Sequence, residues 1–243
     1  MRRRQNPYKR RRVDPFKSEA ALCAAFMETA RAQGLEVYPE TSGWDMLVVD
    51  PGTGEQAGIE AKKRANVDVL YQALGSEHQA GPEVHAVLVP SASQAFARVA
   101  YELRIVSIQG WIFDEETRRS QRSYTRARVV RDILFDRTPR WVHPGPAWVP
   151  EVQVDLVAGA PSPRSLTPWK MAAVRMALRL RETGTVTRRE ILDAGMGWAL
   201  WRDRWLEPTG EVRNRSTLYR ARPDAALPDV LYPAVAQALR EAS

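Results

Sequence analysis

The sequence predicts an α/β protein, built on a mixed sheet with flanking helices, that is followed by a small C-terminal domain. Between residues 18 and 113, runs with helical spacing alternate with short apolar runs typical of strands. From Thr138 to Pro168 the chain carries seven of its 17 prolines, which indicates a linker or an extended crossing segment. We therefore expect four parts: a basic arm over 1–16, an α/β domain over 17–137, a proline-rich segment over 138–167 and a second domain over 168–243.

The elements of the α/β domain follow from caps, turns and apolar periodicity. Ser18 can cap a helix that runs to about Gln33, because apolar side chains recur at helical spacing and Gly34 can end it. The turn-forming stretch 51–54 (PGTG) joins two short runs and predicts an antiparallel hairpin. After the first helix, the expected elements in chain order are strands at 35–38, 44–50 and 56–63, a helix at 67–75, a strand at 84–90, a helix at 91–103, and strands at 105–108 and 111–113.

Composition excludes several classes of protein. Of the 243 residues 44% are hydrophobic, and no stretch approaches the roughly 20 apolar residues that span a bilayer, so a disordered, collagenous or membrane-spanning chain is not expected. The N-terminal sequence MRRRQNPYKRRR has no apolar core behind it, so we expect no secretory signal and a cytoplasmic protein, nucleoid-associated when bound to DNA. One cysteine, Cys23, and three scattered histidines (His78, His85 and His143) cannot form a Cys/His zinc cage. Any metal must therefore be held by oxygen.

Charge is distributed unevenly along the chain. The net charge of +7 divides into +6 over residues 1–16, −6 over 17–103, +3 over 104–165 and +4 over 166–243. Of the 36 basic residues 31 are arginine, which favours bidentate contacts to phosphate, although a GC-rich genome would produce the same bias. We interpret the basic flanks as contacts for DNA. The N-terminal arm is expected to follow the phosphate backbone, and the alternative is a disordered, solubilising tail.

A carboxylate and an ammonium group share one face of the expected strand that contains Ile59-Glu60-Ala61-Lys62. Side chains alternate along a strand, so Glu60 and Lys62 point to the same side. Asp45 begins the partner strand of the hairpin and is expected to lie close enough to share a divalent ion with Glu60. Oxygen ligands of this kind suit Mg²⁺ or Mn²⁺, and Lys62 could orient a metal-activated water. This set of residues therefore predicts hydrolysis of a phosphodiester.

The order of Asp45 and then Glu60-Ala61-Lys62, on a hairpin between two helices, resembles the PD-(D/E)XK nuclease superfamily, which has the restriction-endonuclease-like fold. The resemblance covers about residues 18–113 and implies a DNA nuclease that uses Mg²⁺ or Mn²⁺. It implies that Asp45, Glu60 and the backbone carbonyl of Ala61 hold the metal and that Lys62 assists the attacking water. It also implies a catalytic or positioning role for Glu19, which lies on the helix before the first strand.

The segments ETSGWD, IEAKK and YQAL look especially like the Holliday-junction resolvase branch of this superfamily and its VRR-type relatives. This likeness matches Ser42 to a serine just before the aspartate and implies DNA contacts by Tyr71 and Gln72. The alternative is that Tyr71 and Gln72 are ordinary helix residues. Trp44 stands where the family pattern has proline before the aspartate.

Each of the other site residues has a structural alternative. Glu60 and Lys62 could form the solvated face of an edge strand, where charge prevents aggregation. Glu19 could stabilise its helix through the helix dipole. Lys63 and Arg64 are expected to reach phosphate beside the site, and the alternative for them is a solvated strand end.

The C-terminal domain is expected to contain three short helices and a β-hairpin. Pro168 opens a helix to about Thr183, a capping box at Thr187 opens a second helix, and a third runs from Trp198 to about Trp205. Extended runs near 205–207 and 216–221 flank the polar loop PTGEVRNR. This pattern resembles a winged helix, which places one helix in the major groove and a basic hairpin against the backbone. It implies DNA contacts by four arginines: Arg202, Arg204, Arg213 and Arg215. The alternative is a protein-interaction domain whose tryptophans form its core.

Two functions follow as hypotheses. The first is a Mg²⁺-dependent DNA endonuclease, with branched or junction DNA as one class of substrate. The second is a non-catalytic DNA-binding or regulatory protein that uses the winged helix and keeps the nuclease-like domain as a scaffold. A third class, an RNA-binding structural protein, rests only on the basic arm. Cleavage of both strands of a duplex would imply a homodimer.

Overall fold

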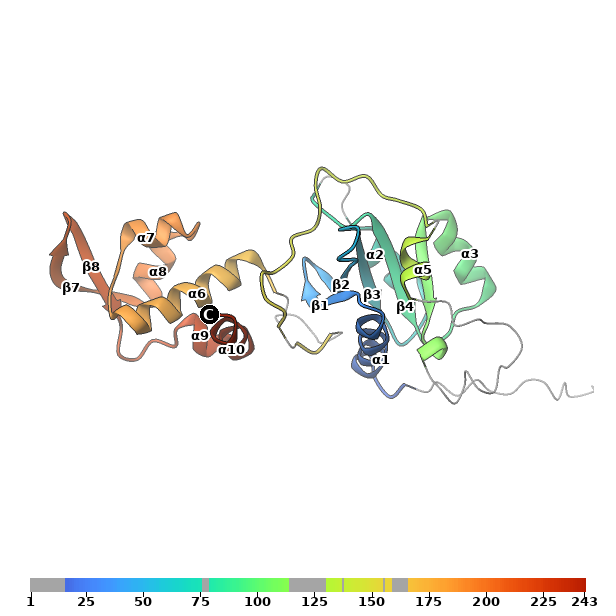
Figure 1. The fold of residues 1–243 in the computed structure, drawn as a ribbon, viewed down its shortest axis with the longest axis horizontal. Coiled ribbons are helices and arrows are strands. Elements are labelled where there is room, and N and C mark those ends of the chain that lie inside the picture. The colour runs from blue at the N-terminus through green and yellow to red at the C-terminus, as the bar shows by residue number, and fades with distance from the viewer. Residues whose placement is uncertain (1–15, 76–78, 114–129, 137, 155, 159–165) are drawn as a thin grey trace, which may run out of the picture.

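The computed structural model describes residues 16–75, 79–113, 130–136, 138–154, 156–158 and 166–243 (Figure 1). Residues 1–15 of the expected N-terminal basic arm lie outside these ranges, whereas Phe16 packs in the core. The first half of the described chain forms a five-stranded mixed sheet in the order β1-β2-β3-β4-β5, with strands β1 (Glu36–Thr41), β2 (Trp44–Val49), β3 (Gln56–Ala61), β4 (Val84–Val89) and β5 (Ile105–Gln109). The first three strands are antiparallel neighbours, whereas β3, β4 and β5 run parallel. The expected α/β class with a mixed sheet and flanking helices is confirmed.

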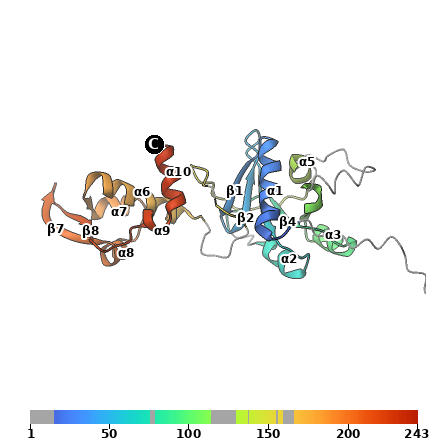
Figure 2. The same ribbon diagram turned by 90° about the horizontal axis from the view of Figure 1, so that it is seen from below.

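Helices cover both faces of this sheet (Figure 2). Helix α1 (Glu19–Ala32) begins as expected at Ser18, whose hydroxyl accepts a hydrogen bond from the Ala21 N–H. It packs Leu22 and Phe26 against one face together with α5 (Val130–Phe135). Helix α5 was not predicted from the sequence. The opposite face is covered by α2 (Val67–Leu74) and α3 (Gln94–Glu102).

The order of helices and strands through β5 is the expected one. The exception is residues 111–113, which were expected to be a strand and instead belong to a 3₁₀ helix, η1 (Gly110–Phe113). β5 ends at Gln109, and the chain turns back under α1 at Gly110, where a Cβ atom would meet Leu22 at 2.3 Å. A close approach of this kind requires glycine, and it is not visible in local apolar periodicity.

Part of the proline-rich segment lies against the sheet as a crossing segment, which we define as residues 138–154. The side chain of buried Gln56 accepts a hydrogen bond from the Ala147 N–H at 2.7 Å and donates one to the Ala147 carbonyl at 3.1 Å. Ala147 and Val149 then cover the outer faces of β1 and β2. Of the two alternatives that the proline pattern left open, an extended crossing segment describes these residues, because tertiary contacts hold them to the sheet.

Two histidines serve to pack this crossing segment. Fully buried His85 on β4 stacks on Trp141 with ring centroids 4.4 Å apart, and its Nε2 lies 3.1 Å from His143 Nε2. Burial, helped by the neighbouring His143, lowers the pKa of His85 to about 4. His85 therefore stays neutral at physiological pH, which suits a role in packing.

The ring of Trp44 lies directly over Gly58 of β3, where a Cβ atom would come within 2.3 Å of the indole. We expect Gly58→Ala to lower the free energy of unfolding by about 1–3 kcal/mol, because the buried ring must move to admit one methyl group. Urea unfolding of the variant measures this loss. Gly145→Ala is the control, since no atom lies within 4 Å of its Cβ position. Equal stability of the two variants would contradict this packing.

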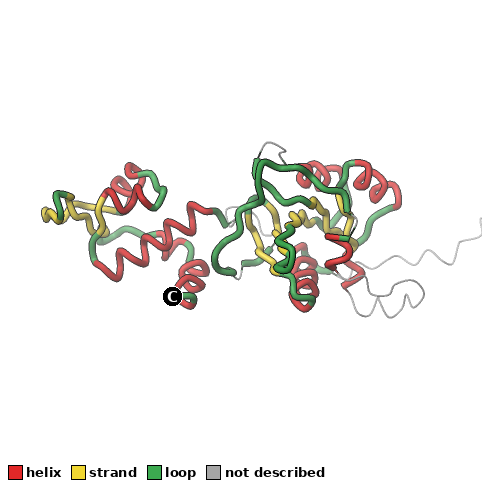
Figure 3. Tube along the Cα trace, turned by 45° about the horizontal axis from the view of Figure 1, so that its top comes forward, coloured by secondary structure: helices red, strands yellow, loops and turns green. Residues whose placement is uncertain are grey.

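The C-terminal domain combines several helices with a small three-stranded sheet (Figure 3). In chain order its elements are α6 (Pro168–Thr183), β6 (Val186–Thr187), α7 (Arg188–Asp193), α8 (Trp198–Arg204), β7 (Leu206–Arg213), β8 (Ser216–Ala221), α9 (Pro228–Leu231) and α10 (Pro233–Glu241). The sheet order is β6-β8-β7, with antiparallel neighbours. Trp201, Trp205 and Ile191 lie in its core, so these two tryptophans serve packing.

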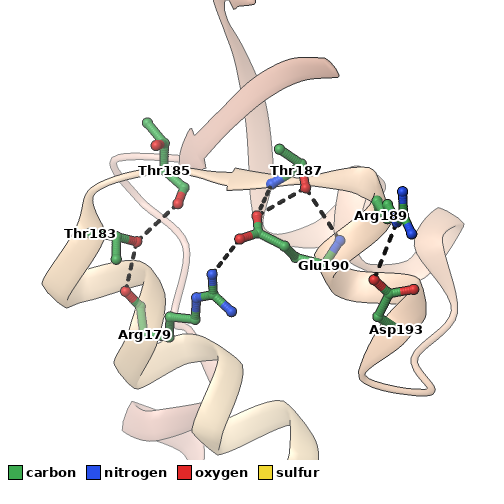
Figure 4. A network of polar contacts seen from close by, with 7 residues as sticks. All are labelled: Arg179, Thr183, Thr185, Thr187, Arg189, Glu190 and Asp193. Carbon is green, nitrogen blue, oxygen red and sulfur yellow. Dashed lines mark hydrogen bonds and ion pairs between the residues drawn. The ribbon is translucent and has the colours of Figure 1, made fainter. Parts of the chain in front are cut away.

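Figure 4 shows the capping box that opens α7. Glu190 Oε2 accepts a hydrogen bond from the Thr187 N–H at 2.7 Å, and the Thr187 hydroxyl accepts one from the Glu190 N–H at 3.2 Å. Arg179 of α6 pairs with the same carboxylate, so the capping box also ties α7 to α6. The capping box predicted from the sequence is confirmed.

No helix of the described chain is long and apolar enough to cross a membrane.

Candidate functional site

Asp45 and Glu60 lie on adjacent strands of the sheet. The register pairs Met46 with Ile59, so extending it by one residue places Asp45 beside Glu60. Asp45 Oδ2 accepts a hydrogen bond from the Ala61 N–H at 2.8 Å, which holds this carboxylate against the end of β3. The structure thus brings together the three residues expected to hold a metal.

Glu60 is a buried carboxylate that accepts no hydrogen bond and forms no ion pair within the described ranges. The residue is 8% exposed, and across the described ranges no group donates a hydrogen bond to its carboxylate or pairs with it within 4 Å. Burial, with a further contribution from the charges of Asp45 and Glu40, raises the pKa of Glu60 to about 8, although Lys62 acts in the opposite direction. Such a group must be protonated or neutralised by a cation.

Burial also raises the pKa of Asp45. The hydrogen bond from Ala61 and the charge of Lys62 favour the ionised form and limit this rise, whereas Glu19 adds to it. Asp45 therefore accepts a hydrogen bond that stabilises its charge, whereas Glu60 accepts none from the described residues and has only the charge of Lys62 in its favour.

Lys62 and Glu19 face each other beside these carboxylates. Lys62 Nζ lies 3.8 Å from Glu19 Oε2, and both side chains are about one-third exposed, at 32% and 29%. The Lys62 N–H donates to the Leu88 carbonyl at 3.0 Å, which extends the pairing with β4. Glu19 Oε1 accepts a hydrogen bond from the Lys63 N–H at 3.2 Å, so the start of α1 is anchored to the end of β3. Glu19 is also the first residue of α1, where a carboxylate interacts favourably with the helix dipole. The geometry therefore agrees both with a role in the site and with stabilisation of the helix.

Two further residues belong to the same surroundings and were missed from the sequence. Glu40 at the end of β1 is 6% exposed, and its charge raises the pKa of Glu60. Cys23 of α1 is buried below the site, and burial together with the charges of Asp45, Glu19 and Glu40 raises its thiol pKa. The hairpin register would have indicated Glu40, since in a tight hairpin it falls opposite Asp45, but strand β1 was expected to end at Tyr38.

Of the residues near the site that are expected to contact DNA, three are exposed to solvent and one bonds to the protein backbone. Tyr71 and Gln72 of α2 are exposed, Tyr71 to 77%, and Arg64 is exposed as well. Lys63 instead turns its ammonium group to the backbone carbonyl of Phe16. The Ser42 hydroxyl donates to the Trp148 carbonyl at 2.7 Å, which fastens the turn before Asp45 to the crossing segment.

Of the four arginines that are expected to contact DNA, one forms an ion pair and three do not within the described residues. Arg202 of α8 forms an ion pair with its neighbour Asp203 at 2.7 Å, which raises the pKa of Arg202. Arg204 at the end of α8, and Arg213 and Arg215 in the β7–β8 hairpin, are exposed and form no ion pair within 4 Å with any described residue. These three arginines are therefore better placed to meet phosphate than Arg202 is.

The donor set of the site fits a hard divalent cation. Mg²⁺ is usually held by one or two carboxylates and keeps several of its waters. Asp45, Glu60 and the Ala61 carbonyl supply oxygen ligands of that kind. In the part of the chain that the structure describes, no group of three or more His, Cys, Asp or Glu side chains is placed to hold a metal, so an ion held here would need water as its further ligands.

Comparison of the chain with models of known protein families, with curated proteins and with solved structures gives no match.

Proposed function

We propose that this protein is a Mg²⁺- or Mn²⁺-dependent endonuclease that hydrolyses phosphodiester bonds in DNA, with a nuclease domain of the PD-(D/E)XK type. The observation that carries this proposal is Glu60, a buried carboxylate with no hydrogen-bond or ion-pair partner among the described residues and with Asp45 beside it. Two carboxylates in one poorly solvated place repel each other, and a divalent cation removes both the repulsion and the burial cost. Lys62 supports a hydrolytic role, because it places a cation next to the same carboxylates.

Each residue then has a distinct task. Asp45, Glu60 and the Ala61 carbonyl would hold the metal, which when bound polarises a phosphate oxygen and lowers the pKa of a bound water. Lys62 orients the attacking water or offsets the negative charge that develops on the phosphate. Glu19 acts through Lys62, because its carboxylate, fixed by the Lys63 N–H, limits where the ammonium group can lie.

The C-terminal domain supports the choice of DNA as substrate. A helix pair, α7 and α8, followed by the β7–β8 hairpin on a β6-β8-β7 sheet is the arrangement expected of a winged helix. In this arrangement α8 would enter the major groove and the hairpin would lie along the backbone. Arg204, Arg213 and Arg215 are then the phosphate or groove contacts.

Arg215 offers a test that separates DNA binding from stability. Asn214 and Arg215 form the two-residue turn of the hairpin, with φ of 51° and 64°. A residue other than glycine pays about 1 kcal/mol in this conformation, so Arg215→Gly should leave stability unchanged or raise it by up to about 1 kcal/mol. It should also weaken duplex binding and lower the slope of log affinity against log salt by about 1. Fluorescence anisotropy at several salt concentrations measures both quantities.

The control for this test is Arg240→Gln, which removes one positive charge from α10 at the other end of the domain. Binding by Arg215→Gly that equals binding by the control would show that the hairpin does not contact DNA.

A second function is favoured by one observation. Because no group of three or more possible ligand side chains converges in the described chain, the site could be too weak for catalysis. The protein would then be a non-catalytic DNA-binding or regulatory protein whose nuclease-like domain serves as scaffold.

Cleavage assays decide between the two functions. The full chain is incubated with supercoiled plasmid, linear duplex, a four-way junction and single-stranded RNA, each with Mg²⁺, with Mn²⁺ or with EDTA. The proposal predicts nicking of DNA that requires the metal. Binding of DNA without any metal-dependent product would favour the scaffold function. Double-strand cuts would in addition point to a homodimer with two sites.

A further inference from the structure

Glu40, Asp45 and Glu60 form a row across three neighbouring strands. The β1–β2 register pairs Pro39 with Met46 and Thr41 with Trp44, so Glu40 falls opposite Asp45. Extending the β2–β3 register by one residue beyond the Met46–Ile59 pair places Asp45 opposite Glu60. Residues directly opposite each other on antiparallel strands have Cβ atoms about 4.5–5.5 Å apart. The fold therefore gathers three carboxylates from separate strands.

Burial and charge indicate that Glu40 lies near the other two carboxylates. Glu40 is 6% exposed, although carboxylates normally lie in water. Its charge acts on Glu60, and also on Cys23 of α1, which packs below the site. Glu60 provides the independent sign that a ligand belongs here, because its nearly buried carboxylate has no hydrogen-bond or ion-pair partner in the described ranges.

Residues from the crossing segment and from just before α6 hold the turn that carries Glu40. Glu40 and Ser42 both have left-handed backbone conformations, with φ of 50° and 54°. The Glu40 carbonyl accepts a hydrogen bond from the Leu166 N–H, and Thr41 forms a parallel bridge with Leu166. The Ser42 hydroxyl bonds to the Trp148 carbonyl. The crossing segment and the residue just before the α6 cap therefore hold this turn.

We propose that Glu40 is a positioning residue of the cation site, which accepts hydrogen bonds from the water shell of a divalent ion held by Asp45 and Glu60. An indirect role follows because Glu40 does not join a converging group of three ligand side chains among the residues described. Mg²⁺ and related ions keep several waters, and a carboxylate near those waters orients them. Because this role exists only if the site holds a divalent ion, it rests on the proposed function.

The test is calorimetric titration of the full chain with Mn²⁺ alone, at pH 7.5 and without DNA. We expect Glu40→Gln to weaken Mn²⁺ binding by about tenfold, the scale at which outer partners of metal ligands act, with one ion still bound at the site. Glu36→Gln is the matched control, since it removes a carboxylate from the same strand four residues away. It should bind Mn²⁺ as the wild type does.

Two further variants guard against a purely structural effect. Glu40→Asp keeps the charge and should restore most of the affinity. Ser42→Ala removes the bond to Trp148 without touching a carboxylate and should weaken Mn²⁺ binding several-fold. In cleavage assays, the Glu40→Gln protein should need more Mg²⁺ for half-maximal rate and should recover most of its maximal rate at saturating Mg²⁺.

Three results would overturn the role of Glu40. Wild-type affinity in Glu40→Gln would show that it does not act on the ion, while leaving the proposed function intact. Complete loss of the bound ion in Glu40→Gln, with Glu40→Asp no better, would make Glu40 a direct ligand. Absence of both Mn²⁺ binding and cleavage in the wild type would remove the proposed function and this role together.

Discussion

Asp45→Asn should reduce Mg²⁺-dependent cleavage by about a thousandfold, and Lys62→Ala by about a hundredfold to a thousandfold. The cleavage rate should fall further in Asp45→Asn, because the Asp45 carboxylate is the proposed metal ligand that the Ala61 N–H holds in place. Lys62 contributes through charge in the transition state, so the metal site should survive its loss. Single-turnover nicking of supercoiled plasmid measures both effects.

The controls are two exposed residues of matched chemistry near the start of the domain. Glu28→Gln on α1 removes a solvated carboxylate, and Lys17→Ala removes a solvated ammonium group. Both variants should cleave within a factor of a few of the wild type. Equal nicking by all the variants, Asp45→Asn included, would indicate a contaminating nuclease and would leave the catalytic proposal without support.

Glu60→Gln should make the metal-free protein more stable at high pH while it abolishes cleavage. The pKa of Glu60 is about 8 in the folded protein, against an ordinary value of 4.5 for a glutamate. Between these two values the folded state holds a proton that the unfolded state has released, so the stability of the wild type falls as pH rises from about 4.5 to 8. The full difference corresponds to a few kcal/mol. The amide in the Glu60→Gln variant is uncharged throughout, so the variant lacks this loss.

Urea unfolding at pH 5, 7 and 9 in EDTA checks the expectation. The wild type and Glu60→Gln should be closest at pH 5 and furthest apart at pH 9, with the variant more stable. When Mn²⁺ replaces the EDTA, it should stabilise the wild type at pH 9 and leave Glu60→Gln nearly unchanged, because the ion neutralises the carboxylate that has lost its proton. Glu28→Gln should follow the wild type. Parallel curves for the wild type and Glu60→Gln at all three pH values would mean that Glu60 is not held in a poorly solvated place.

Much of the fold could be predicted because its signals are local. Ser18 caps α1 through its own hydroxyl, and Thr187 with Glu190 opens α7, so three or four neighbouring residues determine where these helices begin. The stretch 51–54 made the hairpin visible, and the hairpin placed Asp45 near Glu60. The alternation of side chains in a strand predicted a shared face for Glu60 and Lys62, but β3 ends at Ala61, one residue before Lys62 and two before the expected end. The charge of Lys62 still acts on Glu60.

The features that were missed depend on contacts between distant residues. Gln56 bonds to Ala147 across 91 positions, and neither sequence neighbourhood reveals this partner. Glu40 was missed because the strand was expected to end at Tyr38. In the structure β1 continues three residues further, to Thr41, and this extension places Glu40 opposite Asp45. Arg202, which is expected to contact DNA, is a different case, because the residue that it pairs with, Asp203, is its neighbour in the sequence.

The most direct test of the central claim is a crystal soaked in Mn²⁺ and measured for the anomalous signal of the ion. The account predicts one Mn²⁺ within about 2.5 Å of carboxylate oxygens from both Asp45 and Glu60, with the Ala61 carbonyl or water completing its shell. Carboxylates that face different sides of the sheet, with no anomalous peak between them at saturating Mn²⁺, would contradict it.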